Sequence, residues 1–195
     1  MTEEQRHLFK LLSICLSYPD EMLFNSLGEI EADILTLAGP ARETMRAFID
    51  ALKAQSRIAF QEHYTTAFDL NPAACLNLTY HLMGNGEDRG RALADMQDIY
   101  HRAGFEMSVK ELPDYLPLVL EFLAEGPGEA QTTVFRRFLT AVPAIAKQLE
   151  EAASPYATLL RLLCTIVPTN EEKTVMHVAT SRNQGPLEPK SQPGV

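Results

Sequence analysis

Residues 111–126 read ELPDYLPLVLEFLAEG, a largely apolar stretch with prolines at positions 113 and 117. A proline inside a helix removes a backbone hydrogen bond, but the first N–H groups of a helix have no intrahelical acceptor. If Asp114 is the N-cap, Pro117 is the third helical residue, where its missing donor costs little. An apolar stripe then faces a core, made of Leu116, Val119, Leu120 and Leu123. The stretch is therefore predicted to be a core helix with a rigid entrance.

The rest of the chain repeats the same spacing of apolar residues, every three or four positions, and period-two alternation is missing. This spacing predicts helices near residues 8–18, 30–38, 45–52, 60–68, 87–103, 135–149 and 156–167. The helix over 135–149 is expected to be kinked at Pro143. The predicted fold class is an all-α, single-domain helical bundle of roughly eight helices.

Two short motifs predict where helices begin and end. Gly104 stands where a left-handed C-terminal cap would close the helix over 87–103, and Phe105 could then fold back on its last turn. Ser154 followed by Pro155 reads as an N-cap with proline in the first helical position. These caps separate the helices of a single bundle.

The composition divides the chain into a folded part and a tail. Among the 195 residues, 46% are hydrophobic and 22% are charged, which is enough to bury one core. From Pro168 onward aromatic residues are absent and prolines recur, so the domain is expected over 1–167 and a flexible, disordered tail over 168–195. The tail's charges cancel, so the net charge of -9 belongs to residues 1–167.

Charge and cysteine usage exclude several classes. An acidic chain with a pI near 5.0 does not suit nucleic acid, because phosphate contacts need clustered Lys and Arg. Cys15, Cys75 and Cys164 are far apart and set among apolar neighbours, so buried reduced thiols are expected in place of a disulfide framework. No stretch has the pattern of a signal peptide or a membrane span, so a cytoplasmic protein without stable membrane insertion is expected.

The sequence contains no recognisable catalytic motif. Asp98 and His101 have the i, i+3 spacing of a helical metal site, but no second Asp/Glu-x-x-His accompanies them, so Asp98 is expected to pair with Arg102. GNGEDRG, residues 84–90, lacks the Lys-Ser/Thr of a phosphate loop and reads as a loop into a helix. No enzyme activity, no metal and no cofactor is predicted.

ELPDYLPLVLEFLA resembles the Glu-x-Pro-Asp-His-x-x-x-x-Leu signature of the redox enzyme maturation chaperones of the TorD/DmsD superfamily. More narrowly it resembles the NarJ branch, the molybdenum cofactor assembly chaperones of respiratory nitrate reductase. LFKLLSICLSYPDE, YTTAFDL and DRGRALADM agree in the same order, and together the resemblance covers about residues 5–165. Tyr115 stands where the wider family often has His, so a proton-linked role of that His cannot be transferred.

The resemblance implies a chaperone. It would bind the N-terminal, twin-arginine-leader-like peptide of the apo catalytic subunit of nitrate reductase and delay membrane docking until the molybdenum cofactor and the iron–sulfur centre are inserted. The physical reading fits, since a basic amphipathic peptide would lay its apolar face in a groove between helices, with an acidic rim to steer it.

The resemblance also proposes residues for the peptide groove. The first candidates match the signature: Pro113, Asp114, Tyr115, Leu116 and Pro117. The second group matches two other blocks: Tyr64, Phe68, Asp69 and Leu70, then Asp88, Arg89 and Gly90. Tyr64 and Phe68 fit a core position better than a peptide contact. The DRG block has a second reading, in which its one role is to start its helix. Asp114 can be either a helix cap or a peptide contact.

Two readings from other classes remain open. The chain can be an acidic helical adaptor or regulatory scaffold for another protein partner, or an all-helical metal hydrolase that rests only on Asp98 and His101. Peptide titration separates the chaperone from the adaptor, and bound transition metal would favour the hydrolase.

Overall fold

The computed structural model of the chain describes residues 1–107, 111–126 and 128–166, and most of these residues lie in helices. Their one extended pairing is an isolated antiparallel bridge between Asn77 and Tyr115, so the predicted all-α fold class is confirmed. The helices are α1 Glu3–Leu16, α2 Glu21–Asn25, α3 Leu27–Ile34, α4 Gly39–Lys53, α5 Arg57–Tyr64, η1 Thr65–Asp69, α6 Leu78–Met83, α7 Glu87–Arg102, α8 Leu116–Ala124, α9 Glu129–Leu139, α10 Val142–Glu151 and α11 Tyr156–Cys164. The tail expected over 168–195 lies outside the described residues.

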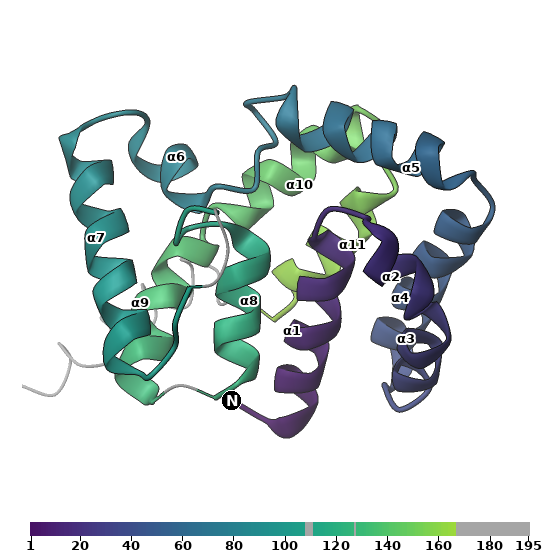
Figure 1. Cartoon of the computed structure of the whole chain (residues 1–195), viewed down its shortest axis with the longest axis horizontal. Coiled ribbons are helices and arrows are strands. Elements are labelled where there is room, and N and C mark those ends of the chain that lie inside the picture. The colour runs from purple at the N-terminus through teal and green to yellow at the C-terminus, as the bar shows by residue number, and fades with distance from the viewer. Residues whose placement is uncertain (108–110, 127, 167–195) are drawn as a thin grey trace, which may run out of the picture.

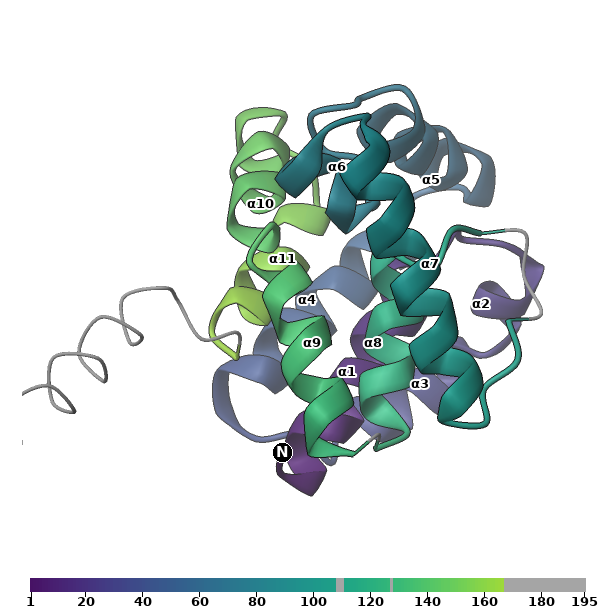
Figure 2. The same cartoon turned by 90° about the vertical axis from the view of Figure 1, so that its left-hand side faces the viewer.

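Helices α1 and α8 pack side by side in the middle of the molecule (Figure 1). Helices α6, α7 and α9 lie on one side of this pair and α2, α3 and α4 on the other, while α11 packs against both α4 and α10. Figure 2 shows α7, α8 and α9 together on one face. Because α8 contributes fully buried side chains such as Leu116, Val119 and Leu123, the stretch 111–126 supplies a central core helix, as its apolar stripe predicts.

The described residues contain more helices than the roughly eight expected. The short helices α2 and α6 were not anticipated, because a helix of one to two turns leaves little periodicity in the sequence. The kinked helix predicted over 135–149 is wrong: the chain breaks at Thr140 and Ala141 into α9 and α10, with Pro143 in the first turn of α10. The last helix starts at Tyr156, and its N-cap residue is Pro155 in place of the predicted Ser154.

The predicted cap of α8 also differs from the structure. Tyr115, in extended backbone, is the N-cap residue, and no side chain caps this helix. Pro117 lies in the first turn, as expected, where its missing N–H leaves no acceptor unsatisfied. The carboxylate of Asp114 points away from α8, so its role as the N-cap of that helix is ruled out and it has a different partner, described below.

The predicted helix over 60–68 ends in a π-helical turn. Residues Thr65–Asp69 follow α5 with a wider turn, which puts Tyr64 and Phe68 into a cluster of aromatic rings with Tyr156. Both side chains are 3% exposed. The core position favoured for Tyr64 and Phe68 agrees with this packing.

The three cysteines have free thiols, as expected, but they are not equally buried. Cys15 is fully buried on α1, whereas Cys75 and Cys164 are half-buried. In the part of the chain that the structure describes, no helix has both the length and the apolar composition that crossing a membrane requires.

Candidate functional site

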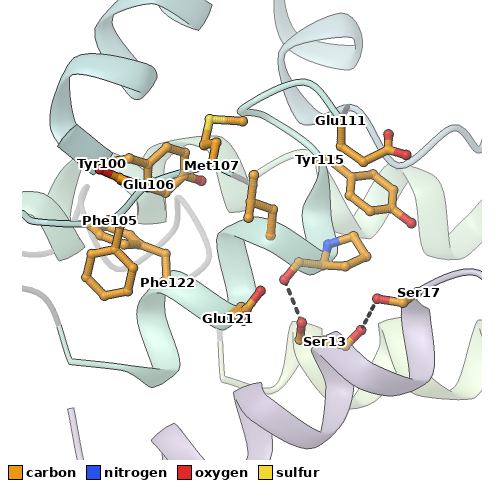
Figure 3. A pocket seen from close by; sticks show the side chains of 12 residues that line it. Ser13, Ser17, Tyr100, Phe105, Glu106, Met107, Glu111, Tyr115, Glu121 and Phe122 are labelled. Atoms are coloured by element: carbon orange, nitrogen blue, oxygen red, sulfur yellow. Dashed lines mark hydrogen bonds between the residues drawn. The ribbon is translucent and has the colours of Figure 1, made fainter. Parts of the chain in front are cut away.

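A cavity of about 190 Å³ opens where α1, α8 and the segment after α7 meet (Figure 3). Its apolar wall is made of Phe105, Met107, Leu118 and Phe122, and its polar floor includes Ser13 and Ser17. The remaining lining residues are Tyr100, Glu106, Glu111, Tyr115, Pro117 and Glu121. We call this cavity the anchor pocket. Pockets that enclose a whole small molecule usually hold roughly 300–1,000 Å³, so the anchor pocket suits a few side chains of a larger ligand.

The end of α7 explains how Phe105 reaches this pocket. Gly104 adopts a positive φ of 82°, and the N–H of Phe105 donates to the Tyr100 carbonyl while that of Gly104 donates to His101. These two bonds form the Schellman motif that the sequence predicts. The chain turns back, and the ring of Phe105 packs edge-on against Phe122 of α8 with centroids 5.0 Å apart. A C-terminal cap therefore builds one wall of the pocket.

A buried hydrogen bond joins the two helices under the pocket. The Ser13 hydroxyl on α1 donates to the Pro117 carbonyl at 2.7 Å, and the Ser17 hydroxyl donates to the Ser13 carbonyl at 2.9 Å (Figure 3). A net stabilisation of about 1 kcal/mol is typical of such a bond. The bond fixes the start of α8 against α1, so the pocket floor is rigid.

Three carboxylates surround the opening, from Glu106, Glu111 and Glu121, and we call them the acidic rim. All three residues are exposed, and within the described part of the chain no Lys, Arg or His lies within ion-pair distance of them. An apolar cavity bordered by negative charge attracts a ligand that is both apolar and basic.

Residues 113–117, which match the signature, are called the signature segment. Asp114 lies on the side of this segment that faces away from the anchor pocket, with none of its surface exposed. Its Oδ2 accepts a hydrogen bond from the backbone N–H of Thr79 at 3.0 Å and another from the Thr79 hydroxyl, and its Oδ1 accepts from Asn77 Nδ2 at 3.0 Å. Arg89 completes the group, with Nη2 3.8 Å from Oδ2 and Nε donating to Thr79 Oγ1 at 3.1 Å. We call these four residues the Asp114 cluster.

The Asp114 cluster caps a helix that is remote in sequence. Thr79 lies in the first turn of α6, so the carboxylate satisfies an N–H that has no intrahelical acceptor and adds favourable charge at the positive end of the helix. The backbone reinforces this contact, because Leu78 N donates to Asp114 O and Leu116 N donates to Leu76 O. The signature segment, α6 and the start of α7 thus form one unit.

Tyr115 points the other way and lines the anchor pocket. Its hydroxyl lies 2.7 Å from that of Tyr64, which also donates to the Leu16 carbonyl at 3.1 Å. Burial raises the pKa of Tyr115 to about 12, and the hydrogen bond with Tyr64 opposes that rise. Burial also raises the pKa of Tyr64. Both phenols are therefore neutral at physiological pH.

The residues proposed from the sequence fall into three groups. Tyr115 and Pro117 line the anchor pocket. Pro113, Asp114, Leu116, Tyr64 and Phe68 are buried inside the fold, and Arg89 is tied to Asp114. Asp69 and Asp88 are exposed, and Asp88 is 4.0 Å from Arg91 one turn further along α7.

Sequence reasoning missed most of the pocket lining. Met107, Glu106 and Leu118 carry no motif, and Glu121 is recognisable in the sequence only as an outward-facing helical position. A usable signal was present at Phe105, since the predicted cap at Gly104 already turns this ring back toward the bundle. The convergence of α1, α8 and the cap needed the three-dimensional structure.

The candidate metal pair has an ordinary structural explanation. Asp98 lies 3.5 Å from Arg102 on the surface of α7, the pairing that the sequence favours. Over residues 1–107, 111–126 and 128–166 there is no group of three or more His, Cys, Asp or Glu side chains placed to hold a metal ion. These residues give no structural support to the hydrolase reading.

Comparisons with known proteins agree with the resemblance of the motifs. The sequence model of the nitrate reductase delta subunit family matches residues 36–161, more than half of the chain. The probable nitrate reductase molybdenum cofactor assembly chaperone NarJ of Bacillus subtilis is 37% identical over 83% of this chain and 89% of its own. The NarJ chaperone of Escherichia coli K12 is 30% identical over 82% of this chain and 69% of its own.

A solved structure supports the fold. A putative redox enzyme maturation protein from Archaeoglobus fulgidus superposes with a TM-score of 0.60 and 26% identity, over 80% of this chain and 90% of that one. The helical architecture, the motif order and the curated relatives agree with one another. The chain therefore belongs to the nitrate reductase delta subunit family and is a NarJ-type assembly chaperone, not an enzyme.

Proposed function

We propose that this chain is a cytoplasmic chaperone that binds the N-terminal, twin-arginine-leader-like peptide of the apo catalytic subunit of a respiratory nitrate reductase. By holding that subunit before membrane docking, it assists insertion of the molybdenum cofactor and assembly of the enzyme. The names of the relatives support a nitrate reductase as the partner. The anchor pocket supports the peptide as the bound segment.

The observation that carries the proposal is an apolar pocket inside an acidic rim. An amphipathic peptide buries one or two apolar side chains against Phe105, Leu118 and Phe122, while its basic side chains meet Glu106, Glu111 and Glu121. Because the cavity holds only about 190 Å³, few side chains are fully buried and the affinity is modest. A modest affinity suits a chaperone that must release its client.

The Asp114 cluster and the Tyr64–Tyr115 pair act in this proposal as positioning groups. They hold the signature segment between α6 and α1, so that Tyr115 and Pro117 face the pocket while Asp114 faces the interior. In this assignment Tyr115 and Pro117 contact the peptide. Asp114, Arg89 and Tyr64 act through the backbone that carries them.

Calorimetric titration with the N-terminal peptide of the cognate catalytic subunit tests the proposal. We expect wild-type protein to bind, and the triple variant Glu106→Gln, Glu111→Gln, Glu121→Gln to bind about tenfold more weakly, since each exposed charge pair contributes about 0.5 kcal/mol. The difference shrinks at high salt, where the Debye length falls to about 3 Å.

A matched variant separates placement from net charge. Glu29→Gln, Glu43→Gln and Asp50→Asn remove the same number of exposed carboxylates from α3 and α4, away from the pocket. This control is expected to bind almost as wild type does. Absence of heat with wild-type protein at low salt, together with no competition by the peptide for the apo subunit, would overturn the proposed function.

A further inference from the structure

The linker between α1 and α2 holds an exposed tyrosine close to the anchor pocket. Tyr18 is 45% exposed, and its ring packs edge-on against Tyr64 with centroids 5.4 Å apart. Tyr64 in turn contacts Tyr115, which lines the pocket. Tyr18 therefore lies two side-chain contacts beyond the pocket wall and outside the cavity itself.

The backbone that carries Tyr18 is constrained on both sides. The following residue, Pro19, is buried, and its carbonyl accepts a hydrogen bond from Gln61 Nε2 at 2.8 Å. Asp20 N donates to the Tyr18 carbonyl at 2.8 Å, and the Asp20 carboxylate caps α2 through Leu23 N. The half-exposed ring is thus held by the fold, as an aromatic contact surface needs to be.

A further exposed carboxylate lies in η1, next to the aromatic cluster that contains Tyr64. Asp69, at the end of η1, is exposed, and within the described residues it takes part in no ion pair. The carboxylates of Asp69 and Glu111 add to the effect of burial in raising the pKa of Tyr115, so both charges act on its hydroxyl. Asp69 directly follows Phe68, whose ring packs against Tyr64 with centroids 4.8 Å apart, so the end of η1 lies beside the Tyr64 ring that Tyr18 also contacts.

The anchor pocket is too small to be the whole peptide surface. A helical peptide of about 12 residues is roughly 18 Å long, whereas the cavity of about 190 Å³ accepts only a few side chains. A peptide anchored there must run over neighbouring surface. Tyr115, at the edge of the pocket, leads to the aromatic ring of Tyr18 and the charge of Asp69.

We propose that the peptide surface continues from the anchor pocket over Tyr115 onto Tyr18 and Asp69, where a second basic side chain of the same peptide stacks on the Tyr18 ring near the Asp69 carboxylate. The inference rests on the proposed peptide-binding function and extends it to a second recognition point. An arginine or lysine over a tyrosine ring is attracted by the ring quadrupole, and a nearby carboxylate adds charge complementarity.

A fluorescence experiment tests whether the peptide reaches this point. The chain contains no tryptophan, so Tyr18→Trp introduces a single indole while keeping an aromatic ring for the cation. We expect its emission to change as the N-terminal peptide of the cognate catalytic subunit is added, and the change to saturate with the calorimetric binding curve. Leu35→Trp, at the exposed C-cap of α3 and outside the lining of the anchor pocket, is the control and is expected to stay unchanged.

Affinity measurements test the chemistry of the contact. Tyr18→Ala is expected to weaken binding about fivefold, Tyr18→Phe less than about twofold, and Asp69→Asn about threefold. Replacing the basic residues of the peptide one at a time with glutamine identifies the partner, because one replacement costs much less in Tyr18→Ala than in wild type. Circular dichroism and thermal unfolding check that each variant is folded.

The outcomes distinguish the two proposals. If the peptide binds with wild-type affinity to Tyr18→Ala and Asp69→Asn, and saturates Tyr18→Trp without changing its emission, the extended surface is wrong while the anchor pocket stands. If wild-type protein binds no peptide, both proposals fail. A peptide-dependent emission change at position 18 with coupling to one basic residue supports the extended surface.

Discussion

Asp114 and Tyr115 are neighbours in the signature segment, and they serve opposite sides of it. Asp114 is fully buried and satisfies the start of α6 with the help of Arg89, whereas Tyr115 faces the anchor pocket and carries its hydroxyl toward Tyr64. The extended backbone at Tyr115 turns one side chain inward and the next outward. A motif of adjacent residues therefore combines a structural half and a binding half.

The comparison explains why the two prolines flank these residues. Pro113 is buried, and its carbonyl accepts a hydrogen bond from the Tyr100 hydroxyl at 2.9 Å, while the Pro117 carbonyl accepts from Ser13. Each proline fixes the backbone dihedral φ near -65° and presents its carbonyl to another helix. The entrance of α8 is thus held at both ends, and the direction of Asp114 and Tyr115 is set by the backbone between them.

The largest effect is expected from substitution of Asp114, the structural half of the motif, on the stability of the fold. Asp114→Ala leaves the Arg89 guanidinium without its ion-pair partner and the Thr79 N–H without its acceptor, so the free energy of unfolding falls by about 3 kcal/mol. Urea unfolding followed by circular dichroism measures this loss. Asp88→Ala, at the exposed acid of the DRG block, is the control and changes stability by less than about 0.5 kcal/mol.

The same variant tests the division between the two halves. If Asp114→Ala unfolds at the wild-type urea concentration but no longer binds the peptide, Asp114 is a peptide contact and the division is wrong. Asp114→Asn sharpens the result, because the amide keeps an acceptor for Thr79 N but loses the charge opposite Arg89. We expect its stability to lie between those of wild type and Asp114→Ala.

Substitutions in the anchor pocket, which Tyr115 lines, are expected to change the affinity for the peptide. Phe105→Ala removes an aromatic wall of the anchor pocket while leaving the Gly104 cap and the helix ends intact, so peptide binding weakens about tenfold. Ile58→Ala removes an exposed apolar side chain outside the pocket and is the matched control. Titration calorimetry with the same peptide gives both values. Equal losses in the two variants would contradict a localised pocket.

The sequence predicts the fold better than the site, for a physical reason. Helical periodicity and caps are local, so the core helix over 116–124 and the Schellman turn at Gly104 could be inferred from neighbouring residues. The break between α9 and α10 was missed because Pro143 fits a kink and a new first turn equally well.

The candidate site depends on contacts between distant segments. Asp114 and Thr79 are 35 positions apart, and Ser13 and Pro117 are 104 apart, so neither hydrogen bond leaves a local pattern. Local reasoning assigned Asp114 to the nearest helix, α8, although the helix that it caps is α6. The family motif did identify the right segment, but the direction of each side chain required the packing of α1, α6 and α8.

The smallest effect concerns the proton chemistry at position 115. With its pKa raised to about 12 by burial, Tyr115 stays neutral across the physiological range and contributes no pH dependence to peptide binding there. Tyr115→His restores the residue common in the wider family, with an ordinary pKa of about 6.5. The imidazole gains a positive charge as pH falls, beside the peptide's own positive charges.

We therefore expect the affinity of Tyr115→His for the peptide to fall about threefold between about pH 8 and pH 6 relative to wild type. The ratio of variant to wild-type affinity at each pH is the quantity to measure, because all other side chains are common to both proteins. Tyr115→Phe, which keeps the ring without a titrating group, is expected to show a constant ratio. A constant ratio for Tyr115→His as well would place position 115 outside the electrostatic reach of the bound peptide. Peptide binding would then depend on the other residues of the anchor pocket.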